Sequence, residues 1–190
     1  MVTPWPAYFC AAANLAAVVA MATVLAPGTT LVDEPARAAY VRENAALWRA
    51  GWSLWVLAAI SLLVFYRWWA QRIRASVALL WIAAAGFAVD LVAESLLIVV
   101  APERPDVARV SFILTGGVAN GLYTLAGALL SRLTPGMDGV FARWTWTMWT
   151  LGAVLSVVTF LELPIAIAAA SAALFALFIP WCVAMGRRLA

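Results

Sequence analysis

The chain has 190 residues, of which 66% are hydrophobic and only 11% are charged, a balance that excludes an ordinary soluble domain and requires a lipid bilayer as solvent. The net charge of +3 comes from 12 arginines and nine acidic residues, spread too thinly along the chain for a nucleic-acid surface. Histidine is absent, which excludes histidine-ligated zinc, bis-histidine haem and the Ser–His and Cys–His nucleophile pairs. The composition therefore predicts an all-α, polytopic integral membrane protein.

Apolar stretches long enough to span a membrane recur along the whole chain. Six candidates occupy residues 7–26, 47–69, 77–101, 110–130, 144–160 and 165–185. Only Leu161 to Pro164 separate the last two, but together they are too long for one spanning helix, and Pro164 suits the first turn of a new one. A reentrant hairpin is the alternative there. We expect a single transmembrane domain over residues 1–190, folded as a six-helix bundle with both termini on the same side.

Arginines near the helix ends predict the orientation of this bundle. With both termini inside, the cytoplasmic segments hold one acid, Asp138, and seven arginines: Arg67, Arg72, Arg74, Arg132, Arg143, Arg187 and Arg188. The other side then holds five arginines and six acids. The bias favours cytoplasmic termini in a bacterial-type inner (plasma) membrane, with the opposite orientation as the alternative. On the outer side, Asp33, Glu34 and Pro35 begin a predicted short interfacial helix that could cover an entrance.

The second stretch begins with an aromatic face. Trp48, Trp52 and Trp55 recur at i, i+4 and i+7, and Arg49 is offset from them by one position. We expect Trp52 and Trp55 to wall a pocket and Arg49 to pair with the acids of the next stretch. The alternative is an interfacial belt of tryptophans with Arg49 reaching the headgroups. The other tryptophans near helix ends fit such a belt: Trp68, Trp69, Trp81, Trp144, Trp146 and Trp181.

The third stretch contains two acids, Asp90 and Glu94, on one helix face. A charge inside the hydrocarbon costs at least ~2.5 kcal/mol and persists where it faces the protein interior, a polar cavity or a partner. Two carboxylates one turn apart repel each other, so one of them should carry a proton unless a cation lies between them. The pattern predicts a proton-binding or cation-binding site.

The fourth stretch offers partners for these acids. Gly117 and Gly121 form a small-residue ridge that lets a neighbouring helix approach closely. Asn120, Tyr123 and Thr124 lie beside the ridge, and we expect Asn120 to contact Asp90 at similar depth. In the alternative interpretation these polar groups only fix the helix register.

The remaining motifs are uninformative. Cys10 and Cys182 form no CxxC pair and are read as small buried residues. No phosphate-binding loop or dinucleotide fingerprint occurs, and no metal site or cofactor can be assigned.

These observations favour a non-enzymatic membrane protein with an outward-facing polar pocket that binds, and could transport, a small amphipathic or cationic ligand. Eight residues would form the site: Asp90, Glu94, Asn120, Tyr123, Thr124, Arg49, Trp52 and Trp55. The first alternative is an accessory subunit of a larger membrane complex. The second is an enzyme acting on lipid or isoprenoid, with the two carboxylates as acid and base or as magnesium ligands. The expected partners are membrane lipid, an amphipathic small molecule and either a second copy or a larger complex, but no nucleic acid.

Overall fold

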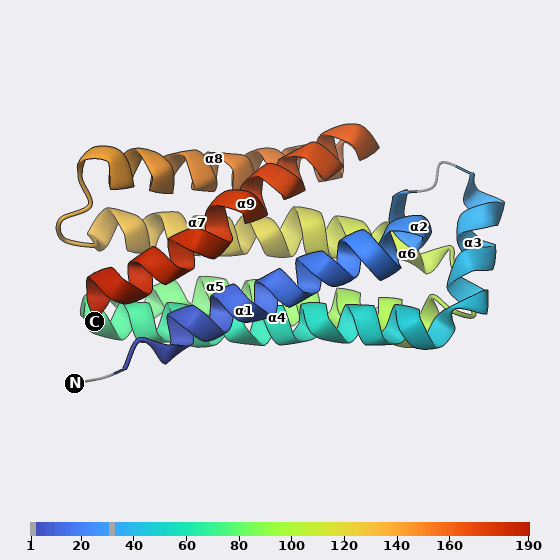
Figure 1. Ribbon diagram of the computed structural model, residues 1–190, viewed down its shortest axis with the longest axis horizontal. Coiled ribbons are helices and arrows are strands. Elements are labelled where there is room, and N and C mark those ends of the chain that lie inside the picture. The colour runs from blue at the N-terminus through green and yellow to red at the C-terminus, as the bar shows by residue number, and fades with distance from the viewer. Residues whose placement is uncertain (1–2, 31–32) are drawn as a thin grey trace.

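The computed structural model describes residues 3–30 and 33–190, and helices account for nearly all of them, with no strand in these ranges (Figure 1). Five helices are long and apolar enough to cross a bilayer: Trp5–Thr29, Ala45–Arg72, Ala78–Val100, Val107–Leu133 and Pro164–Leu189. The prediction of an all-helical, multi-pass membrane protein is thus supported.

The elements follow one another with short connections. In chain order they are α1 (Trp5–Ala20), η1 (Met21–Leu25), α2 (Ala26–Thr30), α3 (Glu34–Glu43), α4 (Ala45–Arg72), α5 (Ala78–Ser95), η2 (Leu96–Val100), α6 (Val107–Phe112), η3 (Ile113–Ala119), α7 (Asn120–Leu133), α8 (Gly139–Phe160) and α9 (Pro164–Leu189). The η elements are π-type windings, in which the hydrogen bond reaches five residues instead of four. Three rods contain such windings: α1–η1–α2, α5–η2 and α6–η3–α7.

The predicted stretch 144–160 lies within α8, a 22-residue helix that is not among the five spans. Its threonines and tryptophans lower its hydropathy, yet three of its four threonine hydroxyls are satisfied within the helix. Thr145, Thr150 and Thr159 each donate to the carbonyl four residues earlier, at 2.7–2.9 Å. A sixth span therefore stays a prediction.

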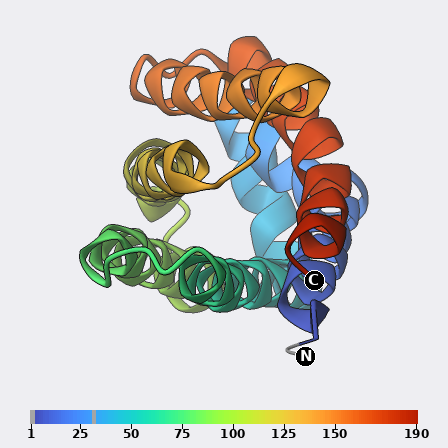
Figure 2. The ribbon, with the colours of Figure 1, turned by 90° about the vertical axis from the view of Figure 1, so that its left-hand side faces the viewer.

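The six long rods form a closed ring. Figure 2 looks at the bundle from the end where α1 begins and α9 finishes. Each rod packs on the next one in the chain, and α9 packs back on α1. A methyl group added at Gly186 would lie 2.9 Å from Ala7 Cβ, and the thiols of Cys10 and Cys182 are 3.9 Å apart. We call this end of the bundle the chain-terminal end and the opposite end the α3 end.

The predicted short helix after Asp33 is confirmed as α3. Pro35 lies in its first turn, where the missing amide hydrogen costs nothing. The Tyr40 hydroxyl donates to the Val24 carbonyl at 2.6 Å, and Val41 is buried against the bundle. These contacts hold α3 against the first rod.

An aromatic core fills the chain-terminal half of the bundle. Trp181 makes ring contacts of 5.4 Å with both Trp69 and Trp149, and Phe65 and Tyr66 pack around Trp69. The assignment of Trp68, Trp69 and Trp181 to an interfacial belt is wrong, since each is at most 4% exposed. Their positions near the helix ends suggested a belt, but a position along the helix does not show that the side chain faces inward. Serine and threonine hydroxyls accept from three of the indoles, at 2.8–2.9 Å: Trp69 to Thr134, Trp149 to Ser131 and Trp181 to Thr145.

Candidate functional site

Asp90 and Glu94 lie one turn apart on α5 and are only 6% and 1% exposed. Both oxygens of Asp90 accept hydrogen bonds from the fourth span. The Thr115 hydroxyl of η3 donates to Oδ1, and the Tyr123 hydroxyl of α7 donates to Oδ2 at 3.2 Å. Asp90 thus faces the bundle interior and contacts the expected helix, but through Thr115 and Tyr123.

A glycine brings the two helices close enough for these bonds. Gly86 lies one turn before Asp90 on α5, and a methyl group added there would lie 3.1 Å from Leu122 Cβ and 3.2 Å from the Tyr123 ring. The same tyrosine is held from behind, because the Tyr66 hydroxyl donates to its carbonyl at 2.9 Å. The α7 backbone at Tyr123 is therefore held by α5 through the close approach at Gly86 and by α4 through the Tyr66 hydroxyl.

The π-type winding of η3 sets the register of the two donors. Thr115 and Tyr123 are eight positions apart, whereas two turns of a regular α-helix cover about 7.2 residues. The looser winding of Ile113–Ala119 takes up the difference and lets both hydroxyls face Asp90. Windings of this kind are frequent at functional sites, and the three found within residues 3–30 and 33–190 lie toward the α3 end.

Glu94 differs from Asp90 in having an oxygen with no partner. Its Oε2 is buried and makes no hydrogen bond within residues 3–30 and 33–190, and the same is true of Nε1 in Trp52 and in Trp55. The Trp48 indole donates to the Leu97 carbonyl at 2.7 Å, which fixes the register between the antiparallel α4 and α5. One turn further along α4, Trp52 reaches the level of Glu94, and Trp55 reaches that of Asp90. An unsatisfied acceptor and two unsatisfied donors thus lie within about one helical turn of each other in depth.

The two tryptophans pack on aromatic rings of other rods. The Trp52 ring lies 5.9 Å from that of Phe112, and the Trp55 ring lies 5.4 Å from that of Phe175 on α9. Trp52 is 3% exposed, so it is an interior wall and not part of an interfacial belt.

Asn120 and Thr124 lie away from the acids, against the expectation. The Asn120 amide donates to the Gly152 carbonyl at 2.7 Å and to Ser156 Oγ at 2.9 Å, both on α8. Thr124 packs directly on Gly152. The ridge of Gly117 and Gly121 also faces α8, which confirms its packing role. The expectation turned the wrong face of this span toward α5, where Thr115 and Tyr123 contact Asp90 instead.

Arg49 also lies away from Glu94. It is exposed, and its Nε donates to the Ile98 carbonyl at 3.2 Å. Among the described residues it forms no ion pair. The expected pairing is therefore not formed, and the position fits the alternative in which Arg49 reaches the headgroups.

An ion pair closes the α3 end of the bundle. Arg109 Nε and Nη2 donate to the two oxygens of Glu162, each at 2.6 Å, joining α6 to the turn between α8 and α9. The hydrogen bonds from Arg109 lower the pKa of Glu162 below its usual value. Glu162 has a φ of 52°, which a tight turn between two long helices requires.

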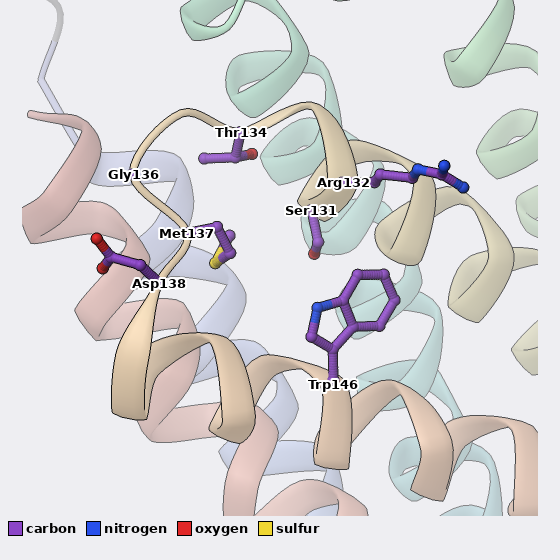
Figure 3. A pocket seen from close by; sticks show the side chains of 7 residues that line it. All are labelled: Ser131, Arg132, Thr134, Gly136, Met137, Asp138 and Trp146. Carbon is purple, nitrogen blue, oxygen red and sulfur yellow. The ribbon is translucent and has the colours of Figure 1, made fainter.

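Two open hollows lie at the chain-terminal end, on α7 and α8, and neither is lined by Asp90 or Glu94. Figure 3 shows the smaller one, of about 360 Å³. The acidic pair itself is enclosed by protein. No group of three or more possible metal-ligating side chains occurs in the described part of the chain. No protein-family model, curated protein or solved structure matches this chain.

Proposed function

We propose that this chain is a bacterial-type inner-membrane protein that binds a small amphipathic cation at Glu94 and Asp90 and carries it across the bilayer. One observation carries the proposal: the Glu94 carboxyl is enclosed at membrane depth and keeps an oxygen without a hydrogen bond. A buried acceptor left unpaired costs about 1–3 kcal/mol, so it persists where a ligand or proton supplies the missing partner.

The surrounding groups favour a particular ligand chemistry. An ammonium group would donate to Glu94 Oε2, and aromatic rings at the depth of the carboxylates suit an organic cation. The indole N–H groups of Trp52 and Trp55 have no acceptor within the described residues, so a ligand that also carries an oxygen would satisfy them. Asp90, already held by two hydroxyls, would set the position of Glu94 and share its proton.

A binding experiment with a defined probe tests this. We expect tyramine, which has an ammonium group, an aromatic ring and a phenol oxygen, to bind to the purified protein in liposomes and to release protons as it binds. Glu94→Gln should remove both binding and proton release, because glutamine keeps the size and loses the titrating group. Glu162→Gln is the matched control, since Glu162 lies in the outer turn and should leave binding unchanged. Equal loss in both variants, or normal binding in Glu94→Gln, would contradict the proposal.

We also propose that α8 crosses the membrane, giving six spans with cytoplasmic termini. The chain-terminal end carries seven of the arginines and a single acid, Asp138, which supports this orientation. Ser76 lies exposed in the connection from α4 to α5 at that end. In a cysteine-free background, a cysteine introduced by Ser76→Cys should be labelled by a membrane-impermeant maleimide only in inverted vesicles. Labelling in right-side-out vesicles would show that the protein has the opposite orientation.

One observation favours a second candidate, an accessory subunit. The first half of α9 exposes a face of small residues: Ala168, Ala169, Ala172, Ala173 and Ala176. Such faces allow close helix contact with a neighbouring protein in the membrane. Ala172→Phe or Ala172→Leu should then dissociate a larger complex seen by native mass spectrometry, and should leave tyramine binding unchanged.

A further inference from the structure

Two hollows adjoin each other at the chain-terminal end: the first lies between the end of α7 and α8, the second lies on α8 alone, and we call the two together the groove. The first, of about 360 Å³, is lined by Ser131, Arg132, Thr134, Gly136, Met137, Asp138 and Trp146. The second, of about 450 Å³, is lined by Arg143, Trp146, Thr147, Thr150 and Leu151. Trp146 belongs to both and is 44% exposed, so its ring lies between the two hollows at the surface.

The groove carries two arginines without partners. Arg132 and Arg143 are exposed, and neither makes an ion pair or hydrogen bond with any described residue. Figure 3 places Arg132 and Asp138 at opposite edges of the first hollow. Arg188 lies 3.5 Å from the Asp138 carboxylate and partly neutralises it. The groove therefore presents net positive charge on both sides of Trp146.

Below the arginines, the same face becomes polar and then apolar. On α8, Arg143 is followed at helical spacing by Thr147 and Thr150, and then by Val154 and Val157, which are 42% and 56% exposed. On α7, Leu125 lies two turns from Arg132 on the same face and is 48% exposed. Charge, hydroxyl groups and hydrocarbon follow one another in the order of a phospholipid's own phosphate, glycerol and acyl chains.

We propose that this groove is a binding site for an anionic phospholipid. The phosphate lies between Arg132 and Arg143 beside Trp146, and an acyl chain follows Leu125 and Val154 toward the membrane centre. Arginines between transmembrane helices recognise phosphate headgroups, and tryptophan prefers the headgroup level. The proposal requires only that these helices lie in a bilayer and is independent of the cation site.

Native mass spectrometry of delipidated protein tests the site. Dioleoylphosphatidylglycerol and dioleoylphosphatidylcholine differ in headgroup charge and share their acyl chains. We expect the first lipid to bind more tightly to the wild type, and the preference to fall about 5-fold for Arg132→Gln or Arg143→Gln and about 30-fold for both together. The double lysine variant keeps the charges and should keep most of the preference.

Arg67→Gln is the matched control, because Arg67 is an exposed arginine on α4 outside the groove. It should leave the preference unchanged, and thermal stability should be equal in all variants. If Arg67→Gln reduced the lipid preference as much as the groove variants do, the anionic lipid would be attracted by positive charge anywhere on the protein surface. That result would overturn the proposal. Displacement of the lipid by millimolar inorganic phosphate would also overturn it, since the acyl contacts would then contribute nothing.

Discussion

The hydrogen bond between Tyr123 and Asp90 can be measured by a double-mutant cycle. Tyr123→Phe removes only the hydroxyl that donates to Asp90 Oδ2 at 3.2 Å, and Asp90→Ala removes the acceptor. Hydrogen bonds between membrane helices couple by about 0.6 kcal/mol on average and by at most ~1.7 kcal/mol. We expect about 0.6 kcal/mol for Tyr123, and the cycle with Thr115→Val measures the second hydroxyl that donates to Asp90 in the same way.

The assay is unfolding by sodium dodecyl sulfate in mixed micelles, followed by loss of helical circular dichroism. The loss of unfolding free energy in Asp90→Asn should be less than half of the loss in Asp90→Ala, because the amide retains an acceptor oxygen and fills the space. Thr124→Val provides the control cycle, since Thr124 is equally buried on α7 but packs on Gly152 of α8. A coupling of zero between Asp90 and Tyr123, or one equal to the Thr124 value, would refute the proposed geometry.

Two further predictions concern the packing of α7 and the closure of the α3 end. Gly127→Ala should destabilise the bundle by about 1–3 kcal/mol in the same assay, since the added methyl group would overlap the Trp149 ring and lie 2.7 Å from the Tyr66 hydroxyl; unchanged stability would contradict that packing. The hydrogen bonds from Arg109 lower the pKa of Glu162 in the folded protein. The ion pair therefore stabilises the fold fully at a pH above the usual glutamate pKa of about 4.3. This stabilisation is lost as the pH falls through the lower pKa of the folded state. Melting temperatures of wild type and Glu162→Gln should therefore differ near neutral pH and converge in acid, and a gap that persists in acid would contradict the ion pair.

The sequence predicted the helices better than their rotations. Stretches of apolar residues locate the spans within a few residues, because the bilayer thickness fixes their length. Asp90 could be placed in the interior, since a carboxyl facing lipid would be costly. Its partner Thr115 was missed, because a period of 3.6 residues places Thr115 about 80° around the helix from Tyr123 and no residue pattern predicts a π-type winding.

Arg49 illustrates a second limit. Its position next to Trp48 fixed its depth but not its direction, and one position along a helix is a rotation of about 100°. That rotation takes its side chain to the surface while Trp48 points at the Leu97 carbonyl. Depth follows from counting residues, whereas direction depends on contacts between helices that are far apart in the chain.

The contact between α1 and α9 has a consequence for biosynthesis. The two helices touch through residues such as Ala7 and Gly186, at opposite ends of the chain. During synthesis every other neighbouring pair in the ring can form as soon as its second helix emerges, but this pair must wait for the last one. Until then α1 exposes to lipid, or to a chaperone, the face that α9 later covers. Truncation of the final helix should therefore leave an open ring whose first helix is accessible, and a ribosome stalled before α9 should hold the protein in that state.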